Sequence, residues 1–294
     1  MATESQSRLI ISIIPLVLIT FFTVGTAKAE MMFKYKSSAV GEIDTTPECY
    51  DPDSVGKVGS APDCEGMLIV DDRMLRSAAS EHADPDGHYQ SDGGGHGDFQ
   101  VIHDSIAYSF VDSPNNVFTG QVQDMSFLFF NTNFDEDIGY WDTSSVTEMR
   151  DMFHRNHSFD HDISDWDVSN VKSIYRMFED TPISADIGKW DVSNVTNMYG
   201  VFQDSSFNRD IGDWDVSNVE SMHYMFKGSS FDQDIGDWDV SNVTAMPGMF
   251  ENAPSFDQDL SGWCVSEFPS KPSDFDSGAW SWNKALPDWG NCPN

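Results

Sequence analysis

A segment rich in Gly, Asp and His, residues 81–98, contains side chains that could bind a transition metal. His82, His88 and His96 are interspersed there with aspartates, and imidazole with carboxylate is a common ligand set. Their spacing matches no standard metal site. The Asp-Pro-Asp-Gly run at residues 84–87 also lacks the third ligand and terminal Glu of a calcium-binding EF-hand loop. The sequence therefore predicts a mobile, solvated loop here.

Aspartates recur at a nearly constant interval along the C-terminal half. One series comprises Asp137, Asp162, Asp186, Asp210, Asp234 and Asp259. A second series comprises Asp142, Asp167, Asp191, Asp215 and Asp239. If such residues stacked about 5 Å apart, they would repel by roughly 1 kcal/mol per pair in water, and by about 3 kcal/mol at an effective dielectric near 20. Two interpretations remain open: each Asp accepts backbone N–H groups of a local turn, or the series bind Ca²⁺.

Other positions vary between segments that are otherwise alike. One position is occupied by Ser126, Arg150, Tyr175, Tyr199, His223 and Pro247, and the next by Phe127, Asp151, Arg176, Gly200, Tyr224 and Gly248. They lie between inward-facing positions, so many should face solvent. The candidate partner-binding residues are Arg150, Tyr175, Arg176, Tyr199, His223 and Tyr224. Their composition is typical of protein-binding patches, although neutral drift of exposed positions would give a similar pattern.

The sequence contains no catalytic signature. It lacks a P-loop, a Gly-x-Ser-x-Gly elbow and a His-Glu-x-x-His zinc motif. Aspartates repeated at equivalent positions indicate architecture, whereas an acid and a base need different environments. We therefore expect no catalytic residue, no enzymatic activity and no cofactor, with bound calcium as the alternative. A hydrolase would need a pocket outside the repeat.

All these positions belong to a repeat marked by tryptophan. The tryptophans are Trp141, Trp166, Trp190, Trp214, Trp238 and Trp263, 24 or 25 residues apart. The fullest copies read SFNRDIGDWDVSNVESMHYMF from Ser206 and SFDQDIGDWDVSNVTAMPGMF from Ser230. About six units therefore span residues 119–263, and each must stack on its neighbours to bury its apolar side. A Trp recurring once per unit is expected in the core.

Local patterns predict the elements of each unit. Apolar residues at Val195, Met198, Val201 and Phe202 have the spacing of one face of a short helix. Ser and Glu three residues apart, as at residues 217 and 220, have capping-box spacing. The Gly-containing half around Asp-Ile-Gly predicts a brief strand. The expected fold is an α/β repeat solenoid whose coils each combine a short strand with a short helix.

The copies resemble the BspA-like leucine-rich-repeat family of microbial surface proteins. That family's units carry the pattern Phe-Asn-x-Asp-Ile-x-x-Trp-Asp-x-Ser-x-Val-x-x-Met-x-x-Met-Phe, which is matched here from Val117 to Trp263. The resemblance implies right-handed LRR-like coils on an exported protein. It also implies roles in adhesion, surface display and protein or matrix binding, and it implies no catalytic residues.

The N-terminus has the pattern of a signal peptide, residues 1–29. Arg8 precedes an apolar run from Leu9 to Val24, and small residues surround the expected cleavage point after Ala29. No second apolar run follows, so we expect no transmembrane span after cleavage; an uncleaved N-terminal anchor is the alternative. The expected localisation is secreted or cell surface.

Four cysteines flank the repeat, which suggests a cap at each end. We expect an N-terminal cap at residues 30–118, including the loop at 81–98, and a C-terminal cap at 264–294. Disulfides are the natural state of an even number of cysteines in an exported chain. Three pairings are formally open, and the positions favour Cys49 with Cys64 and Cys264 with Cys292.

Charge restricts the partners. Asp and Glu number 49 against 16 Lys and Arg, a formal net charge of −33, which makes nucleic acid and anionic membranes poor partners. The expected function is adhesion or scaffolding through a protein, extracellular-matrix or glycan ligand. The alternative is a calcium-dependent structural matrix component that uses the aspartate series.

Overall fold

The computed structural model describes residues 47–50, 55–57, 59, 64, 67–75, 100–103, 106–110 and 117–293, with only the backbone of 47–48, 100–103 and 106–109. All of these lie in the compact unit Thr46–Asn294, and none lies in the other unit, Met1–Thr45. The expected signal peptide at 1–29 and the Gly/Asp/His loop at 81–98 fall outside the described residues. Within the described part, no helix is long and apolar enough to cross a membrane.

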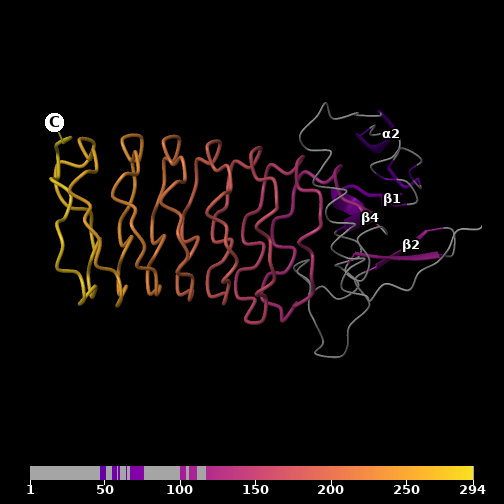
Figure 1. Cartoon of the computed structure of the whole chain (residues 1–294), viewed down its shortest axis with the longest axis horizontal. Helices are drawn as coiled ribbons and strands as arrows, with labels where there is room; N and C mark the ends of the chain where they lie inside the picture. Colours follow the sequence, from indigo (N-terminus) through magenta and orange to yellow (C-terminus); the bar gives the residue numbers. More distant parts are fainter. Residues whose placement is uncertain are drawn as a thin grey trace, which may run out of the picture. The chain divides into compact units, whose positions relative to one another are not determined.

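The regular elements of the described residues are short and precede residue 119. They are α2 (Pro47–Tyr50), β1 (Leu68–Ile69), β2 (Gln100–His103), β3 (Ile106–Ser109), β4 (Val117–Phe118) and a helical turn at 72–75. β1 pairs in parallel with β4, and β2 pairs antiparallel with β3 (Figure 1). The helical turn begins after Asp71, whose side chain accepts the N–H of Met74 at 2.9 Å, as an N-cap does.

The expected α/β solenoid of right-handed coils, each with a strand and a helix, is wrong. Residues 119–293 contain neither a helix nor an extended strand, only turns and isolated bridges. The three-residue apolar spacing arises from successive tight turns, in which Phe130 N–H donates to the carbonyl of Phe127 at 3.2 Å. Other N–H groups donate to the following unit: Phe127 N–H bonds the carbonyl of Arg150 at 2.8 Å. An α-helix would direct them to the residue four positions earlier.

Residues with positive φ prevent helix formation within each unit. Phe127 and Asn131 have φ of 61° and 54°, and the pair four residues apart recurs at Arg176 and Asp180, with φ of 51° and 54°. Left-handed residues interrupt a right-handed helix, because side chains crowd the backbone there. The capping box expected at residues 217 and 220 therefore has no helix to begin.

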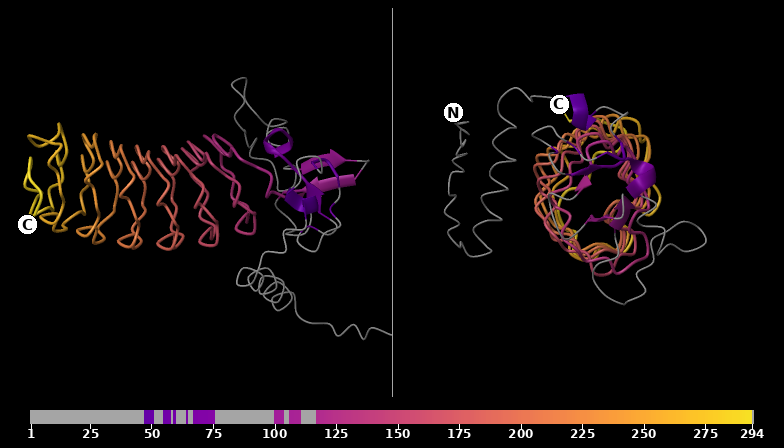
Figure 2. Two further views of the ribbon diagram at one scale, coloured as in Figure 1. Left: turned by 90° about the horizontal axis from the view of Figure 1, so that it is seen from above. Right: turned by 90° about the vertical axis from the view of Figure 1, so that its right-hand side faces the viewer.

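Equivalent positions of successive units lie side by side. Single parallel bridges connect Asp124 to Glu148 and continue at equivalent positions to Ala245. The units follow one another in sequence order along the stack, and their outlines superimpose when viewed along it (Figures 1 and 2). Residues 264–293 continue the pattern as a further coil: Phe250 N–H donates to the carbonyl of Phe275 at 2.8 Å, and Asn252 N–H to that of Ser277 at 2.7 Å.

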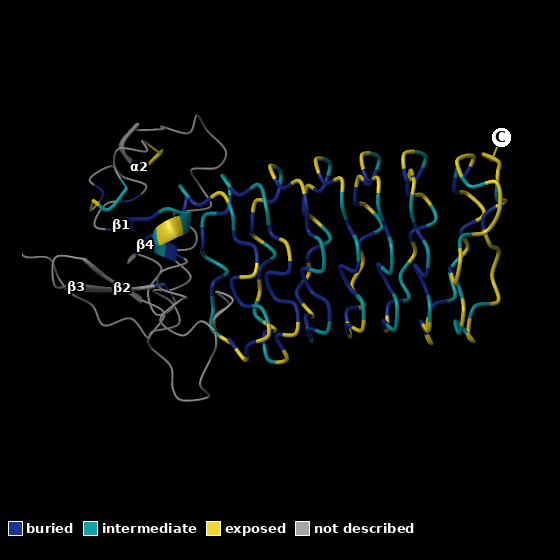
Figure 3. Ribbon diagram, turned by 180° about the vertical axis from the view of Figure 1, so that it is seen from behind, coloured by how far each residue is buried: buried dark blue, intermediate teal, exposed yellow. Residues whose placement is uncertain are grey.

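Aromatic side chains form the continuous core of the stack. Phe153, Phe178 and Phe202 stack with ring centroids 5.8 and 6.0 Å apart. The repeated tryptophans are at most 5% exposed, which confirms them as core residues. Each donates its indole N–H to a carbonyl of the preceding coil, as Trp214 does to Ile187 at 3.0 Å. These bonds satisfy the buried indole N–H groups of the repeat, and exposed residues gather at the turns (Figure 3).

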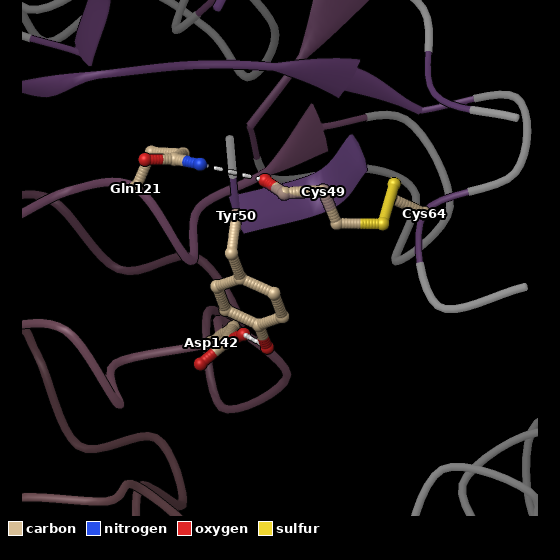
Figure 4. The surroundings of a disulfide bond; sticks show 5 residues. All are labelled: Cys49, Tyr50, Cys64, Gln121 and Asp142. Carbon is tan, nitrogen blue, oxygen red and sulfur yellow. Dashed lines mark hydrogen bonds between the residues drawn. A yellow bond between two sulfur atoms is a disulfide. The ribbon is translucent and has the colours of Figure 1, made fainter. Parts of the chain in front are cut away.

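Disulfides join Cys49 to Cys64 and Cys264 to Cys292, the pairing favoured by the sequence. The first joins α2 to the segment at Cys64, and hydrogen bonds connect α2 to the start of the stack (Figure 4). Gln121 donates its side-chain amide to the Cys49 carbonyl at 2.8 Å, and the Tyr50 hydroxyl donates to Oδ2 of Asp142 at 2.9 Å.

Candidate binding surface

The turn after the central apolar residue of each unit carries three positions whose side chains differ between copies. We call these positions the variable face. Two are the positions recognised in the sequence. The third, which the sequence analysis missed, is occupied by Phe130, His154, Glu179, Gln203, Lys227 and Glu251. The second position is itself a left-handed residue in each coil, and the first and third positions each directly precede a left-handed residue. Each coil therefore places these side chains beside those of its neighbours.

Rings from three successive coils stack on one another in this face. Tyr175 and Tyr199 have centroids 4.8 Å apart and planes 23° apart, and His223 stacks on Tyr199 at 5.5 Å and 21°. Each ring therefore covers a face of the next one. The edges of the rings, rather than their faces, remain for a partner.

Cationic side chains extend this row. The Arg176 guanidinium lies 5.1 Å from the ring centroid of Tyr175 and 5.3 Å from that of Tyr199. Arg150 lies 5.5 Å from Tyr175, and Tyr224 meets Tyr199 edge-on at 5.7 Å. Such cation–π contacts stabilise by about 0.5–1 kcal/mol at exposed sites. The structure thus brings all six candidate residues, including His223, into one series of contacts, which we call the tyrosine stripe.

Burial affects the charge of two members of the stripe. It raises the pKa of Tyr175, against the opposing effect of Arg176, so the phenol stays protonated and can donate a hydrogen bond. It lowers the pKa of His223, which keeps that ring neutral at pH 7. The stripe therefore offers phenol donors and guanidinium charge.

Two glycines of the variable face make room for their neighbours. Gly200 and Gly248 both have φ of +59°. A Cβ on Gly248 would lie 2.4 Å from Cε1 of Tyr224, and one on Gly200 would lie 3.3 Å from Cγ of Arg176. The absence of a side chain at these positions lets Tyr224 and Arg176 lie over the following coil.

A cluster of charged side chains, which includes buried Asp151, His154 and Glu179, contacts the stripe through Arg176. His154 Nδ1 lies 2.8 Å from Oδ1 of Asp151, and its Nε2 lies 3.7 Å from Oε1 of Glu179. Arg176 Nε lies 3.1 Å from Oε2 of Glu179 without hydrogen-bond geometry, so that contact is ionic. Burial raises the pKa of Glu179, while His154 and Arg176 oppose the rise. In the sequence, the feature that could have revealed this cluster is the pair of ionisable residues, His154 and Glu179, at the third variable position of adjacent units.

The aspartate series accept local backbone N–H groups, as the first of the two interpretations expects. In the series that begins at Asp137, Oδ1 accepts the N–H two residues later at distances of 2.9–3.4 Å. The series that begins at Asp142 does the same at 2.9–3.1 Å. Hydrogen bonds from Ser217 lower the pKa of Asp215. The described residues contain no cluster of three or more His, Cys, Asp or Glu side chains suited to a metal ion.

The constant stack and the variable face define a repeat protein in which one surface differs from coil to coil. The family described as "Mycoplasma protein of unknown function, DUF285" matches residues 102–183 and 180–289. These matches cover more than half of the sequence, and the chain belongs to this family. No curated protein and no solved structure matches this chain.

Proposed function

We propose that this chain is an exported or cell-surface protein that binds protein or matrix partners through the tyrosine stripe and does not catalyse a reaction. Two disulfides support an oxidising, extracellular location. The resemblance of the units to BspA-like surface proteins supports adhesion or scaffolding.

One observation carries the proposal: the positions that vary between copies form a single connected surface. Packing dictates the Phe, Trp and Met positions, which are buried throughout the stack. The residues at the variable positions change from copy to copy, yet Tyr175, Tyr199 and His223 stack in order. Tyr and Arg are the residues that most often dominate binding energy at interfaces.

The geometry also favours protein over glycan among the expected partners. Sugars commonly pack on exposed aromatic faces, whereas the faces in this row cover one another. Hydroxyl edges and guanidinium groups instead suit the carboxylates and carbonyls of a protein surface.

Binding of the purified protein to immobilised extracellular-matrix proteins, measured by biolayer interferometry, tests the proposal. The double variant Tyr175→Ala/Tyr199→Ala should weaken binding at least about tenfold. The matched control, Lys189→Ala/Asp213→Ala, changes two exposed residues away from the stripe and should bind like the wild type. Equal binding by the stripe variant, or equal loss in both variants, would show that the stripe is not the binding surface.

A further inference from the structure

A tyrosine hydroxyl already binds one member of an aspartate series within this chain. We call Asp142, Asp167, Asp191, Asp215 and Asp239 the outer series. In Asp142, Oδ1 accepts the N–H of Ser144 at 3.0 Å, while Oδ2 accepts the hydroxyl of Tyr50 at 2.9 Å (Figure 4). One carboxylate oxygen thus stabilises the local turn, and the other receives a phenol from a segment 92 residues away.

The later members of the outer series keep the first of these bonds and lack the second. Asp167, Asp191, Asp215 and Asp239 are exposed, and Oδ1 of each accepts the N–H of the serine two residues later. Among the described residues, no side chain from another coil bonds these four carboxylates. They present the oxygen to which Tyr50 binds in Asp142.

The tyrosine stripe presents matching donors at a matching interval. Tyr175 and Tyr199 come from adjacent coils, as do Asp191 and Asp215, and the same backbone bonds between coils set both intervals. Two copies lying side by side can therefore pair the phenols of Tyr175 and Tyr199 with carboxylates of two adjacent coils without losing register. A partner whose acceptors lie at another interval would meet only one of the two phenols well.

Charge favours the same pairing. Hydrogen bonds from O–H groups and guanidinium to carboxylate are stronger than bonds between neutral groups, and Arg150 and Arg176 add positive charge to the stripe. The net charge of −33 makes two copies repel at long range. At an ionic strength of about 0.15 M the screening length is roughly 8 Å, so charges farther from the interface than this repel only weakly.

We infer that the tyrosine stripe of one copy binds the outer series of a second copy, with the Tyr50–Asp142 contact as the intramolecular example. This inference rests on the proposal above that the stripe is a binding surface. Because the two surfaces differ, a bound pair still has one free stripe and one free outer series, and association continues into chains.

Sedimentation velocity on the purified protein at about 0.15 M salt tests this pairing. The wild type should show a sedimentation coefficient that rises with concentration. The stripe variant Tyr175→Ala/Tyr199→Ala and the outer-series variant Asp191→Asn/Asp215→Asn should each remain monomeric. An equimolar mixture of the two should form a one-to-one dimer, because each variant supplies the surface that the other lacks.

The matched control is Asp186→Asn/Asp210→Asn, which removes equal charge from the other aspartate series and should associate like the wild type. Asn retains an oxygen for the turn, and unchanged melting temperatures verify folding of each variant. A monomeric wild type, a monomeric mixture or a monomeric control would each overturn the inference. If the wild type proves monomeric while the stripe variant still binds matrix proteins more weakly than the wild type does, the inference fails and the proposed function stands.

Discussion

At the scale of single residues, the variable face depends on glycines as much as on rings. Gly200 and Gly248 share the same φ, but the space above them differs because Tyr224 approaches Gly248 more closely than Arg176 approaches Gly200. The ammonium group of Lys227 also lies 4.7 Å from the ring centroid of Tyr224. A change at Gly248 should therefore disturb a ring of the stripe.

Gly248→Ala should lower the free energy of unfolding by more than Gly200→Ala does. Both substitutions place a side chain at positive φ, which costs about 1–2 kcal/mol. Only Gly248→Ala must also displace the ring of Tyr224. Urea unfolding of the two variants measures the difference, and Gly200→Ala serves as the backbone control. Equal losses would show that the Tyr224 ring moves without cost.

Glu179→Gln should change how stability depends on pH. Because burial raises the pKa of Glu179, the folded protein holds this proton more tightly than the unfolded chain does. The resulting stabilisation is complete below the ordinary Glu pKa of about 4.3 and is lost as pH rises through the higher folded pKa. Relative to wild type, Glu179→Gln should therefore gain stability between pH 4 and pH 7. Urea unfolding across this range measures the gain, and a constant or opposite difference would contradict it.

At the scale of elements, the repeated unit is a series of turns held by side chains and by its neighbours. Aspartates bond the N–H groups within each coil, and amides connect adjacent coils. Asn194 and Asn218, for example, donate to the carbonyls of Ser169 and Ser193 at 2.8 and 2.7 Å. Calcium is not needed to explain why Asp recurs in every unit.

Asp215→Ala should destabilise the protein by about 1 kcal/mol, because the N–H of Ser217 loses its acceptor. Asp215→Asn should recover most of this loss, since an amide oxygen can accept the same bond. Thermal melting of both variants, with and without chelator, separates turn formation from ion binding. A loss in the Asn variant equal to that in the Ala variant, accompanied by a chelator effect on wild type, would favour the calcium alternative.

At the scale of the whole described unit, stability comes from contact between neighbouring coils, and disulfides constrain both ends of the stack. The C-terminal disulfide closes a coil whose Phe275 is packed edge-on against Phe250 of the preceding coil at 5.4 Å. Trp282 covers the same core from the last coil, 5.1 Å from Phe250 and 4.8 Å from Phe256.

Cys264→Ser/Cys292→Ser should lower the free energy of unfolding by about 3.6 kcal/mol, the chain-entropy value for a loop of this length. The two cysteines are 28 residues apart. Calorimetry of the variant, and of the wild type with and without reductant, provides the measurement. An unchanged melting profile would mean that packing of Phe275 and Trp282 alone holds the last coil.

The sequence by itself determined the period, the buried Phe and Trp positions and the candidate residues of the stripe. Each follows from local information: Trp214 must be covered wherever its coil lies, and positions that differ between otherwise similar copies can be read by comparing those copies. The Asp turns were also predictable, because an Asp side chain reaches an N–H only two residues away.

Tertiary structure alone decided the conformation of the Val-x-x-Met-x-x-Met-Phe segment. Its three-residue spacing suits both a helix and a run of tight turns, and the choice depends on where the N–H groups find acceptors. Neighbouring coils provide those acceptors, as Arg150 does for Phe127, so the helix does not form. The same contacts bring His154 and Glu179 together from separate coils, a pairing that requires knowing which residues of adjacent coils lie side by side.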